Sequence, residues 1–186
     1  MPVSETSLND FLAAIELFDA RVGGVADETW LAASPCEGWT ARDVVAHCVT
    51  NLRALGDSVT GGDFFATFGN PVEGEISSAW RDARQSVSGA LAAAASGDTA
   101  MVGGNAVPIS AMIDGLMRDL VIHAWDLGRA TGGDEKLPDA LVAAATVAMA
   151  MVGDEQRVPG LYGKEVKVSG GASAQDRLIA LAGRQP

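Results

Sequence analysis

The residues whose types and spacing could carry out chemistry are the only two histidines of the chain and one carboxylate. His123 follows Asp119 by four positions in the segment DLVIHAWDLGRATG. At about 3.6 residues per turn, residues four apart stack on one helix face, so both side chains can reach one point. His47 lies in a second helix-like segment, TARDVVAH. If these two helices pack face to face, His47, Asp119 and His123 form a metal site with open coordination positions.

Two imidazoles and one carboxylate form a ligand set that several divalent metals accept. Three nitrogen and oxygen ligands suit Zn²⁺ with a water or a substrate at the fourth position. The same set suits non-haem Fe(II), and Ni(II) is a further alternative. Such an ion lowers the pKa of a bound water or thiol and polarises a carbonyl. It would therefore support thiol transfer, hydrolysis or enol chemistry.

The same residues also have a structural interpretation. A core histidine whose ring is satisfied by a backbone carbonyl is commoner than a metal ligand, so the pattern alone leaves both roles open. His47 could also act as a base without a metal, but no serine or cysteine with a supporting triad pattern accompanies it. Asp119 falls on the apolar side of its predicted helix. That position favours a metal, because a buried carboxylate is unfavourable unless it is paired or metal-bound.

Helical patterns predict the framework that must position these side chains. Thr40 with Asp43, and Ser173 with Asp176, have the spacing of an N-terminal capping box. Ser7 with Asp10 has the same spacing. We predict five longer helices and one short one: from Ser7 to the glycines at 23–24, from Thr40 to about 55, over 76–95, from Pro108 or Ser110 to about 130, over 138–152, and a short one after Ser173.

Two glycine-containing segments separate the predicted helices. Residues 56–74 contain a glycine pair, a Gly-Asn-Pro turn and an apolar triplet, and we predict a long loop there. A loop of this length in a compact domain is often a lid or a pocket wall. Residues 101–107 are predicted to be an irregular connector broken by glycines.

Other side chains beside the ligand candidates have simpler interpretations. Trp39 and Trp125 are predicted to pack helix ends rather than to stack on a substrate. Asp126 and Arg129 are predicted to form an ion pair at the surface or the end of the helix. Cys48 directly follows His47 and therefore points about 100° away around the helix. We predict that Cys48 is a buried, inert thiol.

Composition narrows the classes of partner. The formal net charge is −11 and the sequence pI is about 4.4. Nucleic acid and anionic membrane surfaces need clustered Lys and Arg, so neither is an expected partner. The N-terminus lacks the basic start and apolar run of a secretory signal, and the longest apolar stretch, residues 141–152, is too short to span a bilayer. Two cysteines make no disulfide framework, so we expect a reduced, cytoplasmic protein. We further expect a small-molecule substrate and a monomeric or homodimeric state.

Three segments resemble the signatures of a known family. They are residues 34–47 (SPCEGWTARDVVAH), 119–132 (DLVIHAWDLGRATG) and 175–184 (QDRLIALAGR). They are similar to the actinobacterial DinB/YfiT-like metal-binding family, which is related to the N-terminal domain of mycothiol-dependent maleylpyruvate isomerase. The resemblance implies a divalent metal, usually zinc, bound at positions that match His47, Asp119 and His123. The isomerase has Glu where this chain has Asp119, and members of the wider family carry Asp there.

The residues and the resemblance together lead to one set of expectations. The fold is an all-α, antiparallel four-helix bundle with a short C-terminal appendage, and residues 1–186 form a single domain. From the resemblance, the function is that of a metal-dependent transferase or isomerase that uses a thiol such as mycothiol. Two alternatives stay open: a metal-binding bundle without turnover, and a biosynthetic isomerase or cyclase that uses the metal as a Lewis acid.

Overall fold

The computed structural model describes residues 5–94, 98–153, 157 and 162–186. Most of these residues are helical, and two short strands form the only sheet among them. In chain order the elements are α1 (Glu5–Gly23), the 3-10 turn η1 (Asp27–Thr29), α2 (Ala41–Val59), α3 (Phe64–Thr67), α4 (Ile76–Ala93), β1 (Thr99–Val102), β2 (Asn105–Pro108), α5 (Ile109–Thr131), α6 (Asp139–Met149) and α7 (Ala174–Leu181).

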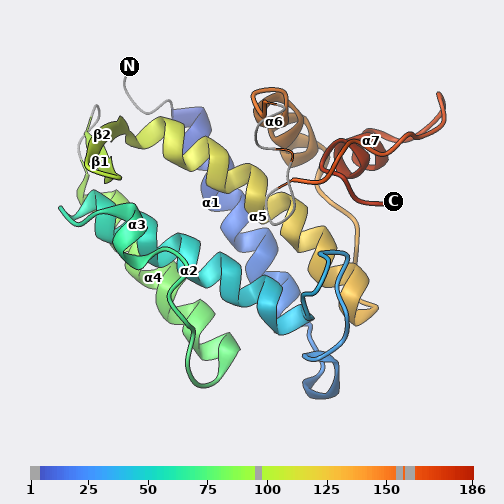
Figure 1. The fold of residues 1–186 in the computed structure, drawn as a ribbon, viewed down its shortest axis with the longest axis horizontal. Coiled ribbons are helices and arrows are strands. Elements are labelled where there is room, and N and C mark those ends of the chain that lie inside the picture. The colour runs from blue at the N-terminus through green and yellow to red at the C-terminus, as the bar shows by residue number, and fades with distance from the viewer. Residues whose placement is uncertain (1–4, 95–97, 154–156, 158–161) are drawn as a thin grey trace.

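The longest helices pack side by side as a bundle (Figure 1). α1 lies along α5, and α2 packs against both α4 and α5. α6 packs on α5, and α7 packs on α6. The predicted helical character of the chain is therefore confirmed. The finer prediction of an all-α, antiparallel four-helix bundle is not confirmed, because a hairpin is present and α6 and α7 also bury side chains in the core.

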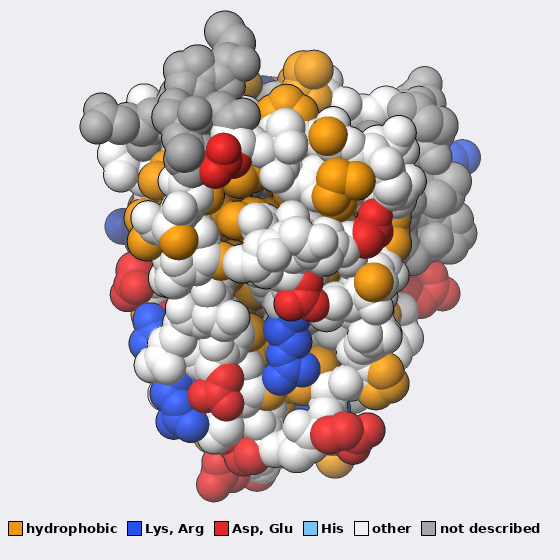
Figure 2. Space-filling model, turned by 90° about the vertical axis from the view of Figure 1, so that its left-hand side faces the viewer, with side chains coloured by type: hydrophobic (Ala, Val, Ile, Leu, Met, Phe, Trp, Pro, Cys, Tyr) orange, Lys and Arg blue, Asp and Glu red, His pale blue; other side chains and the backbone are white. Residues whose placement is uncertain are grey.

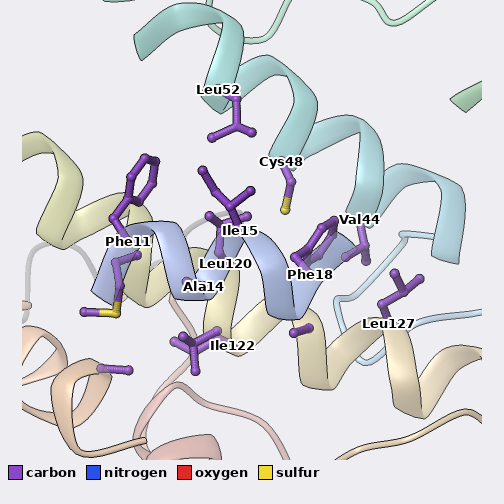
Figure 3. Packing of buried hydrophobic residues seen from close by; sticks show 14 of the residues in the cluster. Phe11, Ala14, Ile15, Phe18, Val44, Cys48, Leu52, Leu120, Ile122 and Leu127 are labelled. Carbon is purple, nitrogen blue, oxygen red and sulfur yellow. The ribbon is translucent and has the colours of Figure 1, made fainter. Parts of the chain in front are cut away.

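The core is a continuous apolar cluster between these helices. Figure 3 shows apolar side chains of α1, α2 and α5 gathered in this cluster. The labelled residues are Phe11, Ala14, Ile15, Phe18, Val44, Cys48, Leu52, Leu120, Ile122 and Leu127. Cys48 is fully buried, and burial raises the pKa of its thiol well above the ordinary value. The prediction of a buried Cys48 is confirmed.

Helix ends follow the capping signals with one exception. Thr40 caps α2, and the side chains of Thr40 and Asp43 each accept a hydrogen bond from the backbone N–H of the other. Ser173 and Asp176 make the same exchange at α7. α5 begins after Pro108 and ends at Thr131, and the next residue, Gly132, has a φ of +69°, which suits glycine. Ser7 is the exception, because α1 already includes Glu5.

The segment predicted as one long loop, residues 56–74, is more ordered than expected. α2 continues to Val59, and the short helix α3 begins after Asp63. The Asp63 carboxylate accepts hydrogen bonds from the backbone N–H groups of Phe65, Gly103 and Gly104. One side chain thus both caps α3 and ties it to the hairpin, which a local sequence pattern does not reveal.

The predicted irregular connector, residues 101–107, is wrong and is replaced by an antiparallel hairpin. Val102 pairs with Asn105, so Gly103 and Gly104 form a two-residue turn. Both glycines have positive φ, +57° and +77°. A type I′ turn, one of the commonest two-residue connections between antiparallel strands, requires this conformation at both positions. The Gly-Gly pair itself was therefore a readable hairpin signal.

Two of the remaining predicted helices are shorter than expected. α4 ends at Ala93 rather than continuing through Ala94, and residue 95 lies outside the described residues. α6 covers Asp139–Met149 within the predicted 138–152. These differences at helix ends leave the positions of the ligand-bearing helices unchanged.

The described surface carries interspersed charges. On the face shown in Figure 2, acidic and basic side chains alternate with apolar and neutral ones. Among the described residues, no helix has the length and apolarity needed to cross a membrane.

A close backbone approach at the end of α5 gives a test of the packing. A Cβ added at Gly128 would meet the carbonyl oxygen of Asp134 at 2.3 Å, whereas one added at Gly115 on the same helix would have only a side-chain atom at 3.9 Å. We expect Gly128→Ala to lower the free energy of unfolding by about 1–3 kcal/mol. Gly115→Ala should be neutral or stabilising by up to about 1 kcal/mol.

Urea unfolding of the two variants beside the parent protein measures both values. Equal stabilities for Gly128→Ala and Gly115→Ala would contradict the described path of the chain after α5.

Candidate metal site

The three residues singled out by type and spacing come together in the structure. His47 projects from the middle of α2, and Asp119 and His123 project from α5, which packs against it. The Asp119 and His47 side chains are 18% and 23% exposed, whereas that of His123 is 6% exposed. The site therefore lies between the two helices with one side open toward solvent.

The candidate donor atoms converge on one small volume. His47 Nε2 is 3.0 Å from Asp119 Oδ2, and His123 Nε2 is 3.5 Å from Asp119 Oδ1. One donor atom from each of the three residues lies within 4.8 Å of the others. Donors bound tetrahedrally to zinc at about 2.0–2.2 Å lie about 3.3–3.6 Å apart. The donor set therefore fits a divalent ion with little rearrangement.

The electrostatics of the site favour an ionised carboxylate. Burial opposes ionisation of Asp119, but the neighbouring His123 and His47 rings outweigh it and hold the pKa of Asp119 well below its usual range. Burial also opposes the charged form of His47, but the Asp119 carboxylate raises the pKa of that ring above its ordinary value. A negative charge thus sits at the centre of the site, which attracts a cation.

Asn51 is a further polar neighbour, one turn after His47 on α2. Its side-chain amide donates to Asp119 Oδ2 at 2.9 Å and lies 3.0 Å from His47 Nε2. No sequence pattern assigned a role to Asn51. Its amide restrains the Asp119 carboxylate.

Aromatic side chains line two sides of the site. The Trp39 ring centroid is 5.1 Å from that of His47 and 6.0 Å from that of His123. Phe68, just after α3, is 6.3 Å from His47. Part of the segment predicted as a pocket wall, residues 56–74, thus reaches the site. Trp125 is buried in the core, in agreement with its predicted packing role.

The predicted ion pair between Asp126 and Arg129 is wrong. Arg129 instead pairs with Glu135 at 2.8 Å. Asp126 is fully buried and accepts a hydrogen bond from His123 Nδ1 at 2.9 Å. The i, i+3 spacing puts Asp126 on the side of His123, and α5 is buried all around at this turn. A surface partner one turn away is therefore out of reach for it.

Two residues near the site were not recognised as neighbours from the sequence. Arg184, two residues before the end of the chain, donates to Asp126 Oδ2 from Nη2 at 3.0 Å and to Oδ1 from Nε at 3.3 Å. The Cys36 thiol donates to Asp126 Oδ2 at 3.3 Å. Cys36 and Arg184 are 148 positions apart, and no local pattern links them. The only sequence signal for these two residues is that they lie in the family-like segments 34–47 and 175–184.

Cys36, His123 and Asp126 form a second group of potential metal donors that shares His123 with the first. Arg184 already fills the cation position of this group, since its Nη2 lies 3.0 Å from Asp126 Oδ2 and 3.3 Å from Cys36 Sγ. A metal ion there would have to displace a guanidinium. The group of His47, Asp119 and His123 is therefore the better candidate.

The surroundings of Cys36 make its thiol unreactive, and alkylation tests this. Burial and then the Asp126 charge raise the pKa of Cys36 to about 12. The reactive species is the thiolate, and an ordinary thiol has a pKa of about 8.5. At pH 8 we expect iodoacetamide to modify Cys36 in the folded protein roughly a thousandfold more slowly than in denaturant. Peptide mapping by mass spectrometry measures both rates, and comparable rates would contradict the described contacts.

The comparisons with known proteins agree with this architecture. The profile of the mycothiol maleylpyruvate isomerase N-terminal domain family matches residues 11–128. No curated protein matches the chain. Among solved structures, the chain is similar in fold to the crystal structure of the mycothiol-dependent maleylpyruvate isomerase, with a TM-score of 0.60, 18% sequence identity, 77% of this chain covered and 68% of that one. The matched region contains His47, Asp119, His123 and Asp126. The chain belongs to the mycothiol maleylpyruvate isomerase N-terminal domain family.

Proposed function

We propose that this protein is a divalent-metal-dependent enzyme that acts on a small molecule. His47, Asp119 and His123 are the metal ligands, and Zn²⁺ is the first candidate, with Ni²⁺ and Fe²⁺ as alternatives. The observation that carries the proposal is the convergence of two ring nitrogens and a largely buried carboxylate from two helices, with donor atoms within 4.8 Å. A divalent ion in such a site supplies Lewis-acid chemistry, since it lowers the pKa of a bound thiol or water and polarises a carbonyl.

The residues of the chain supply the shape of the site. His47 and His123 present ring nitrogens, and Asn51 holds the Asp119 carboxylate by a 2.9 Å hydrogen bond. Trp39 and Phe68 flank the imidazole of His47 and offer apolar surface to a bound molecule. The side of the site that is open to solvent, where His47 and Asp119 are partly exposed, is the route by which a small substrate enters.

A thiol cosubstrate is the second part of the proposal. The family and the structural neighbour both carry mycothiol in their names. We infer that a low-molecular-weight thiol of this kind binds beside the three ligands and attacks a small electrophile, as in a transferase or an isomerase. The thiol has to come from outside the chain, because Cys48 is buried in the core and Cys36 is held protonated.

The wider organisation belongs to the same proposal. The four long helices α1, α2, α4 and α5 form the DinB-like unit, and residues 1–186 form one domain. Cytoplasmic localisation, a monomeric or homodimeric state and the absence of nucleic-acid and membrane partners stay predictions from the sequence.

Titration of the Co²⁺-loaded protein with thiols tests the proposal. Thiolate ligation to Co²⁺ produces an intense near-ultraviolet charge-transfer band. We expect mycothiol to raise this band saturably in the parent protein, because the three protein ligands leave a coordination position open. His47→Ala should remove the response, whereas Arg81→Ala, an exposed substitution on α4, should leave it unchanged.

The other outcomes separate the alternatives. Cobalt binding without a response to any thiol, but with a response to small carboxylates or diketones, would replace thiol transfer by direct Lewis-acid chemistry. Cobalt binding with no response to either class would favour a metal-binding bundle without turnover. Failure of the parent protein to bind cobalt or zinc would overturn the metal site itself.

A further inference from the structure

We propose that Asp126 and Arg184 form a clamp that fixes the His123 ring with Nε2 toward the metal, so that the C-terminal segment helps to build the metal site. This inference rests on the metal site of the proposed function, and it assigns positioning roles to two residues outside the ligand set. It also connects the end of the chain, beyond the family match at residues 11–128, to the chemistry.

The first step is the orientation of the His123 ring. An ionised carboxylate can only accept hydrogen bonds, so the 2.9 Å contact from His123 Nδ1 to Asp126 Oδ2 places the ring hydrogen on Nδ1. The neutral ring then has its free lone pair on Nε2. That nitrogen faces Asp119, 3.5 Å from Oδ1. The hydrogen bond thereby selects the tautomer in which the nitrogen facing the site can bind a metal.

The second step is what keeps Asp126 an acceptor. Its side chain is 0% exposed, so no water replaces missing partners. Arg184 approaches both carboxylate oxygens, with Nη2 at 3.0 Å and Nε at 3.3 Å, and is itself only 9% exposed. Such a two-point contact fixes the plane of the carboxylate as well as its charge. Asp126 therefore cannot rotate away from His123 without breaking a buried ion pair.

The third step is how the chain delivers Arg184. After α7 the chain turns at Gly183, whose φ is +85°. A Cβ at Gly183 would meet the Cα of Gly163 at 2.5 Å, so this turn requires glycine. The backbone N–H of Arg184 donates to the carbonyl of Ile179 at 3.0 Å, and Arg184 Nη1 donates to the carbonyl of Ala182 at 2.8 Å. The guanidinium is held by its own segment before it meets Asp126.

The matched control is a second ion pair, between Arg129 of α5 and Glu135, which follows the end of that helix. Their side chains are 2.8 Å apart and 41% and 35% exposed, far more than those of Arg184 and Asp126. Substitutions in this pair remove the same charges without disturbing the proposed clamp. If substitutions in the two pairs change zinc affinity to different extents, the cause is therefore where Asp126 and Arg184 lie and not the loss of a charge as such.

Zinc affinity, measured by competition with a chromophoric chelator, is the first readout. Loss of an outer hydrogen-bond partner of a metal-bound histidine weakens binding by about 10–100-fold. We expect such a loss in Asp126→Asn and in Arg184→Gln. The double variant should be no weaker than Asp126→Asn alone, because Arg184 acts through Asp126. Arg129→Gln and Glu135→Gln should stay within about twofold of the parent protein.

Nuclear magnetic resonance of the imidazole nitrogens is the second readout, and it needs no clamp variant. The chain has two histidines, and His47→Gln assigns their signals. The spectrum of the metal-free parent protein is recorded near pH 9, about 2.5 units above the pKa of an ordinary imidazole, about 6.5. Under these conditions we expect the ring hydrogen of His123 on Nδ1. Arg184→Gln should shift part of the population toward Nε2–H.

Two results would overturn the clamp: a His123 hydrogen on Nε2 in the parent protein, or unchanged zinc affinity in both Asp126→Asn and Arg184→Gln. If the parent protein binds no zinc, the proposed metal site fails, and the position of the ring hydrogen still decides the clamp.

Discussion

Two carboxylates on one face of α5, Asp126 fully buried and Asp119 largely buried, are the constraint on which the rest of the structure depends. Asp119 and Asp126 are seven residues apart, about two helical turns, so they point to the same side. His123 lies between them and contacts both, with Nε2 3.5 Å from Asp119 and Nδ1 2.9 Å from Asp126. An unpaired buried charge destabilises a protein strongly, by about 3–5 kcal/mol when one partner of a buried pair is removed. Each carboxylate therefore needs partners from elsewhere in the fold.

Those partners come from segments that are distant in the sequence. For Asp119 they are His47 and Asn51 of α2. For Asp126 they are Cys36, in the connector before α2, and Arg184, after α7. The two ring nitrogens of His123 thus have different surroundings. On the Nδ1 side, the Arg184 guanidinium neutralises Asp126. On the Nε2 side, the partners of Asp119 are the His47 ring and the Asn51 amide. The proposed metal ion belongs on this second side, next to Asp119.

The sequence predicts the main helices well, because helix formation depends on apolar spacing and capping residues that are close together in the chain. Apolar spacing and caps located α2, α5 and α7, and the Asp119–His123 spacing was sufficient to predict that both side chains face one point. The neighbours Cys36 and Arg184 could not be predicted from local spacing, because their contacts depend on how chain segments 148 positions apart pack together. The predicted ion pair of Asp126 with Arg129 was wrong because the spacing of charges does not show that α5 is buried on every side at this turn.

X-ray absorption at the zinc edge of the loaded protein tests the central claim most directly, because it distinguishes the two donor groups that share His123. We expect a first shell of nitrogen and oxygen at about 2.0–2.2 Å, with the outer scattering of two imidazoles. That shell corresponds to His47, Asp119 and His123. A sulfur at about 2.3 Å would place the ion against Cys36 and contradict the assignment. The spectrum of only one imidazole would contradict it equally.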